Sequence, residues 1–62
     1  MQAILENNSI KLTFRYDPAI VQYIRLLSGR QFHLPERYWT IPVAETNEAI
    51  LKNLINMGFS VS

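Results

Sequence analysis

Apolar and polar residues alternate along the first part of the chain, on both sides of a pair of asparagines. Asn7 and Asn8 tolerate the positive φ angles of a two-residue turn, so residues 2–6 and 9–14 are predicted to form an antiparallel hairpin. Such alternation is typical of strands that bury one face and leave the other in water. In this register the buried face carries Ala3, Leu5, Ile10, Leu12 and Phe14.

A helical spacing of apolar residues replaces this alternation further along the chain. It predicts a helix over about residues 18–28, because apolar side chains that recur every three or four positions form one stripe. Asp17 is a suitable N-cap, Pro18 suits the first helical position, and Gly29 can adopt the left-handed conformation that ends a helix. The apolar stripe consists of Ile20, Val21, Ile24 and Leu27.

A second hairpin is predicted after this helix. Residues 30–32 are extended, a turn containing Pro35 follows, and residues 38–41 form a strand that Pro42 ends. Alternation places Phe32, Trp39 and Ile41 toward one side. These large side chains are interpreted as part of the core, since aromatic residues supply much of the buried area of a small domain.

A second helix is predicted to begin within residues 43–47 and to end near Met57. Gly58 is a second helix-ending glycine, and Phe59 can then fold back on Leu54, which is the contact of a Schellman motif. The last residues alternate again and are expected to add an edge strand.

The order of elements is therefore β-β-α-β-β-α with a final β. It predicts an α+β fold in which a small four- to five-stranded antiparallel sheet carries two helices packed on one face. Because two short helices cannot cover both faces of the sheet, the opposite face is expected to stay open. Residues 1–62 are expected to form a single small domain, near the lower size limit for one core.

Composition excludes several classes of function. The chain has no cysteine and a single histidine, His33, so neither a disulfide framework nor a zinc cluster is expected. There is no glycine-rich phosphate loop, and Asp17, Glu45 and Glu48 are better explained as helix-start residues than as catalytic carboxylates. The chain is predicted not to be an enzyme, and no cofactor, metal or small-molecule substrate is expected. It has no apolar run of membrane-spanning length and no signal-peptide pattern, which predicts a cytoplasmic protein.

Residues 14–42, FRYDPAIVQYIRLLSGRQFHLPERYWTIP, resemble the HARP domain, the HepA-related module beside the ATPase of DNA-annealing helicases, and the likeness covers roughly residues 10–59. Similar stretches occur at the N-termini of bacterial helicase-related proteins and of some tyrosine recombinases. Ser28 stands where the family often has proline, and Arg25 and Arg37 stand where it often has lysine. The matching residues are Phe14, Tyr16, Asp17, Pro18, Val21, Ile24, Arg25, Leu27, Gly29, Arg30, Phe32, Trp39, Ile41, Pro42, Gly58 and Phe59.

The resemblance implies a DNA-binding accessory domain with a role in DNA repair or recombination. Such a module is expected to be the N-terminal part of a larger DNA-acting protein, or to work in a complex with an ATPase or recombinase domain. Its DNA partner is expected to be bound weakly and without sequence preference, as a fork or a single strand. A second possibility within the resemblance is the N-terminal arm-type DNA-binding domain of a tyrosine recombinase.

Six cations balance five acids, so DNA binding requires the cations to gather on one surface. Alternation places Lys11 and Arg15 on the open face, together with Tyr38, whereas Arg25 falls on the outer side of the first helix. A face with cations and an aromatic ring can hold phosphates and stack a base. The predicted nucleic-acid-binding residues are Lys11, Arg15, Arg25, Arg30, Arg37 and Tyr38.

Two alternatives to this interpretation remain. The charges are also consistent with an ordinary solvated face. The open face, with Ile4, Thr13, Tyr38 and Thr40, or the C-terminal edge strand, is also consistent with a protein-docking module that needs no cluster of cations.

Overall fold

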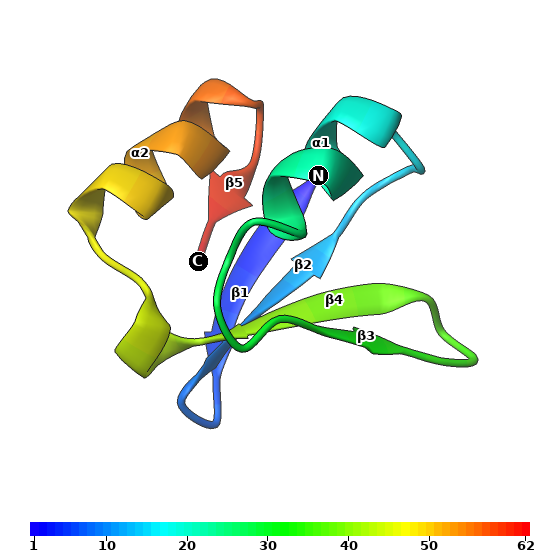
Figure 1. Cartoon of the computed structure of the whole chain (residues 1–62), viewed down its shortest axis with the longest axis horizontal. Helices are drawn as coiled ribbons and strands as arrows, with labels where there is room; N and C mark the ends of the chain where they lie inside the picture. Colours follow the sequence, from blue (N-terminus) through cyan, green and yellow to red (C-terminus); the bar gives the residue numbers. More distant parts are fainter.

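Two antiparallel hairpins form most of the sheet in the computed structural model, which describes residues 1–62 (Figure 1). The sheet has five strands in the order β3-β4-β2-β1-β5, and both helices lie on one face of it. The predicted α+β fold with two helices on one face is thereby confirmed. The strands are β1 (Gln2–Glu6), β2 (Ser9–Thr13), β3 (Gln31–His33), β4 (Tyr38–Pro42) and β5 (Ser60–Val61).

The first hairpin has the predicted turn and register. Asn7 and Asn8 have φ angles of 51° and 63°, the two positive values that a type I′ turn requires. Ala3 pairs with Leu12 and Leu5 with Ile10, so the apolar residues of both strands share one face.

The final strand differs from the prediction in its direction. β5 pairs with β1 in parallel, with Gln2 opposite Ser60, so the sheet is mixed rather than wholly antiparallel. The physical reason is the path of the chain. The second helix returns it to the sheet beside the start of β1, and the chain then runs in the same direction as that strand (Figure 1).

The first helix, α1 (Pro18–Ile24), begins where the sequence predicts and ends earlier. The Asp17 carboxylate accepts a hydrogen bond from the backbone N–H of Ala19 at 2.9 Å. After Ile24 the backbone bonds tighten to a three-residue spacing, with the Leu27 N–H donating to the Ile24 carbonyl. The segment before Gly29 is therefore a series of turns, not the helical continuation predicted to residue 28.

Gly29 closes these turns against the second hairpin. Its φ is +75°, and a Cβ atom built on it would lie 2.7 Å from Cγ of Pro42. The position therefore requires glycine twice over, for its backbone conformation and for the close approach of another segment.

The second helix, α2 (Glu48–Asn56), follows a short 3₁₀ turn, η1 (Val43–Glu45), and ends in the predicted Schellman motif. The Phe59 N–H donates to the Leu54 carbonyl at 3.1 Å, and the Gly58 N–H donates to the Ile55 carbonyl at 2.9 Å. Phe59 and Leu54 are both buried, so this turn also fixes the helix to the core.

The core lies between the sheet and the helices. Its nine buried residues come from both: Ala3, Ile10, Leu12, Ile20, Ile24, Leu27, Ile41, Leu54 and Phe59. Phe14, Val21 and Trp39 are partly buried, and two residues expected in the core are exposed. Leu5 is 61% exposed and Phe32 is 47% exposed, because neither helix extends over the part of the sheet that carries them.

Candidate functional site

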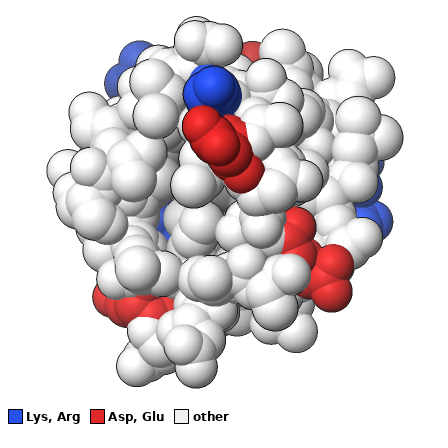
Figure 2. Space-filling view, turned by 90° about the vertical axis from the view of Figure 1, so that its left-hand side faces the viewer, with Lys and Arg blue, Asp and Glu red and all other residues white.

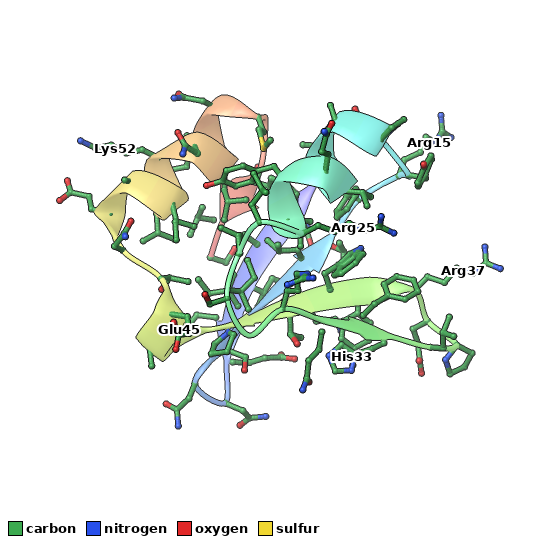
Figure 3. All side chains as sticks on the ribbon, in the orientation of Figure 1. Arg15, Arg25, His33, Arg37, Glu45 and Lys52 are labelled. Atoms are coloured by element: carbon green, nitrogen blue, oxygen red, sulfur yellow. The ribbon has the colours of Figure 1, made fainter.

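On the open face of the sheet, Lys11, His33, Tyr38 and Thr40 form one cluster of contacts, here called the open-face cluster. The Lys11 ammonium lies 4.4 Å from the centre of the Tyr38 ring, and the His33 ring stacks on the same ring at 4.7 Å. A hydrogen bond of 2.7 Å joins His33 Nε2 to Thr40 Oγ1. Figure 3 shows His33 on the side of β3 that faces away from the helices.

This cluster limits what Tyr38 can bind. Because β4 lies between β3 and β2, His33 and Lys11 reach the Tyr38 ring from opposite sides. A base can stack on Tyr38 only if one of them moves away. Lys11 and Tyr38 therefore lie on the same face, as predicted. The two side chains contact each other, however, so the Tyr38 ring is not free to stack on a ligand.

Arg15 is not on the open face. The alternation that predicted it there requires an extended strand, and β2 ends at Thr13, two residues earlier. Arg15 lies in a bend between β2 and α1, and Figure 3 shows its side chain beside the start of that helix. Lys11 and Arg15 consequently do not form the predicted pair of cations.

The helix side of the sheet contains a groove that the sequence did not predict, here called the aromatic groove. It has a volume of ≈ 530 Å³ and lies between α1, the segment after β2 and the second hairpin. Helix α1 has seven residues, so it is only about 10 Å long and does not extend over this hairpin. The lining residues are Phe14, Tyr16, Val21, Phe32, Leu34, Arg37 and Trp39.

Three of the apolar side chains in the groove are strongly exposed. Tyr16 is 74% exposed, Leu34 is 70% exposed and Phe32 is 47% exposed. Phe32 and Trp39 face each other across the hairpin with ring centres 4.9 Å apart. Trp39 packs against the core as expected, but it is only partly buried, whereas Phe32 is a surface residue.

Three of the predicted cations lie around the aromatic groove. Arg37 is part of its wall, and Arg15 stands in the chain between the lining residues Phe14 and Tyr16. Arg25 follows Val21 by one helical turn, and its N–H donates to the Val21 carbonyl at 3.0 Å. In the view of Figure 3, Arg15, Arg25 and Arg37 all extend toward the same side of the molecule.

Five of the six cations have no carboxylate partner. The chain contains one ion pair, between Lys52 and Glu48 of α2, with 3.5 Å between the nitrogen and the oxygen. Figure 2 shows the face near α2 as mostly uncharged, with a cation directly against acidic atoms in its upper part. The remaining cations are Lys11, Arg15, Arg25, Arg30 and Arg37.

Arg30 differs from the other free cations in its contacts. One of its guanidinium nitrogens donates to the Leu27 carbonyl at 3.4 Å, so the side chain folds back on the turns that follow α1. The structure thus distributes the six predicted residues over three places: the open-face cluster, the aromatic groove and the turn at Arg30.

Tyr16 and Leu34 are the groove residues that sequence reasoning did not select. Both are large apolar residues next to positions that need a polar or restricted residue, Asp17 and Pro35. Neither belongs to the apolar stripe of a predicted strand or helix, and this feature of the sequence could have marked them as surface residues. An apolar side chain outside every predicted stripe has no assigned place in the core.

No group of three or more His, Cys, Asp or Glu side chains lies close enough together to hold a metal ion. Neither helix has the length and apolar character that crossing a bilayer requires. No protein-family model, curated protein or solved structure matches the chain. The geometry of the surface and the resemblance to HARP domains therefore carry what can be inferred about function.

Proposed function

We propose that the chain is a non-catalytic, cytoplasmic DNA-binding module that acts beside an ATPase motor or a recombinase domain, in the same chain or in a complex. The observation that most supports this is that the proposed DNA-binding cations have no carboxylate partner. All five that the sequence analysis selected lack a carboxylate partner, and the one cation it did not select, Lys52, is paired. The resemblance to HARP domains supplies the biological context.

Unpaired arginines suit the phosphate backbone, because a guanidinium donates two parallel hydrogen bonds to phosphate oxygens. Three of these arginines, Arg15, Arg25 and Arg37, extend to one side of the molecule (Figure 3). Their contacts to phosphates carry no sequence information, so binding is expected to be independent of sequence. With so few cations it is also expected to be weak and strongly dependent on salt.

The proposal is tested by replacing two free arginines and comparing the result with the paired lysine. In fluorescence anisotropy with a labelled single strand and a labelled fork, Arg15→Gln with Arg37→Gln is expected to weaken binding. Each lost phosphate contact is expected to lower the slope of log K against log salt by about 0.7–0.9. Lys52→Gln removes a cation from α2 and is expected to leave the slope unchanged.

Two results would contradict the proposal. A folded wild-type chain that shows no binding at low salt is not a DNA-binding module. An equal loss for Lys52→Gln and for a single arginine replacement would show that only net charge matters, with no defined surface.

Protein docking is the second candidate function, and a second groove favours it. This groove has a volume of ≈ 250 Å³ and lies beside the edge strand β5. Leu5, Val43 and Val61 are exposed around it, at 61%, 38% and 51%. Absence of DNA binding would make this groove the leading candidate for an interaction surface.

A further inference from the structure

The aromatic groove presents free ring surface, which the open-face cluster does not. Phe32 and Tyr16 are exposed at its edge, and no helix covers them. On the open face, the ring of Tyr38 is covered by His33 and Lys11. A ligand with a flat π-system therefore finds an available stacking surface only on the helix side.

The one charge in the lining of the aromatic groove is positive. Arg37 is the only charged residue among the seven that line it, and Arg15 stands in the chain between the lining residues Phe14 and Tyr16. The acids adjacent in sequence, Asp17 and Glu36, are not among the lining residues; the Asp17 carboxylate accepts the N–H of Ala19 at the start of α1, and Glu36 forms no ion pair with Arg37. A ligand that is flat and apolar in its centre and anionic at its ends matches this arrangement.

The dimensions are consistent with such a ligand. A volume of ≈ 530 Å³ lies within the range of about 300–1,000 Å³ that small-molecule sites have in proteins. Single-stranded DNA combines a flat ring with phosphates on both sides of it. Stacking of bases on aromatic side chains between phosphate-binding cations is the usual way in which proteins hold single strands.

We propose that the aromatic groove receives an unpaired base of single-stranded DNA, with Arg15 and Arg37 on the flanking phosphates. This deepens the proposed function and rests on it, since it names the form of DNA that the module prefers. In a duplex the ring faces are covered by neighbouring bases, and extruding a base costs the free energy of its pairing and stacking. The groove therefore favours single strands over duplex.

Trp39 is the only tryptophan of the chain and lines the aromatic groove, so its fluorescence reports whether the groove is occupied. The experiment titrates the wild-type chain with a labelled thymidine oligonucleotide and with an abasic oligonucleotide of equal length. The abasic strand keeps the phosphates and lacks the bases. We expect both strands to raise the anisotropy, with tighter binding by the thymidine strand, and only that strand to quench Trp39.

Two variants test the role of the ring itself. Phe32→Ala is expected to weaken binding of the thymidine strand by about 5- to 150-fold and to leave binding of the abasic strand unchanged. Phe32→Leu keeps an apolar side chain of similar reach without a π face, and is also expected to lose most of the stacking. Ile55→Ala, at an exposed apolar position of α2, is the matched control and is expected to bind as the wild type does.

The outcomes separate the two proposals. Equal affinity for the thymidine and abasic strands, without quenching of Trp39, would overturn the stacking site and leave the DNA-binding function in place. Equal affinity for duplex and single strand would also overturn the stacking site alone. So would a Phe32→Leu variant that binds the thymidine strand as tightly as the wild type. No binding of either strand at low salt would overturn the DNA-binding function and the stacking site together.

Discussion

Gly29 connects the turns after α1 to the end of β4. A side chain at this position would meet the ring of Pro42, and the backbone there has a positive φ. Both constraints act on one residue, so it is more sensitive to substitution than its exposed surroundings suggest.

Gly29→Ala is expected to lower the free energy of unfolding by more than about 1 kcal/mol, since a left-handed backbone alone costs an alanine about 1–2 kcal/mol. The measurement is the midpoint of urea unfolding. Ser28→Ala, at the exposed position directly before it, is the control and is expected to change the midpoint little. If the two variants have the same midpoint of urea unfolding, the contact with Pro42 is not a constraint on the native state.

At the scale of the elements, α2 packs on the core through one fully buried residue and the partly buried Ile50 and Leu51. Leu54 is its only fully buried residue, while the adjacent Ile55 is 54% exposed. The Schellman turn adds Phe59, which packs edge-on against Phe14 of the segment after β2, with ring centres 5.6 Å apart.

Leu54→Ala is expected to lower the free energy of unfolding by about 2–5 kcal/mol, because a buried leucine leaves a cavity when truncated. A chain of this size has a total stability of only about 3–9 kcal/mol, so partial unfolding is expected. Circular dichroism during thermal unfolding measures the effect. Ile55→Ala removes a comparable exposed side chain from the same helix, and a similar loss there would contradict the assignment of Leu54 as the anchor.

Elements whose limits depend on local stereochemistry were predicted well. The Asn7-Asn8 turn, the Asp17-Pro18 helix start and the Gly58-Phe59 close each follow from the conformational preferences of adjacent residues. The end of α1 and the direction of β5 were not predicted correctly, because both depend on how distant segments pack. Alternation likewise placed Leu5 on the correct face but did not show that no helix covers it.

At the scale of the whole molecule, the sequence gives the number of cations but not their arrangement or their ion pairing. Arg15 was assigned to the wrong surface because β2 is shorter than its alternation suggests, and the aromatic groove was not foreseen because its residues come from three separate segments. The groove exists because α1 is too short to cover the second hairpin. This is a property of the whole fold, and no local sequence pattern indicates it.

The parallel pairing of the first and last strands has a mechanical consequence. Three backbone hydrogen bonds of 2.9–3.0 Å join this part of the chain, from Ser60 to Met1, from Ser62 to Ala3 and from Leu5 to Ser62. Tension applied at residues 1 and 62 pulls β1 and β5 past each other, so these bonds bear load together. Tension applied at residues 1 and 14 instead opens the first hairpin one bond at a time. Single-molecule pulling is therefore expected to give a higher unfolding force in the first geometry, and equal forces would show that the terminal pair bears no load.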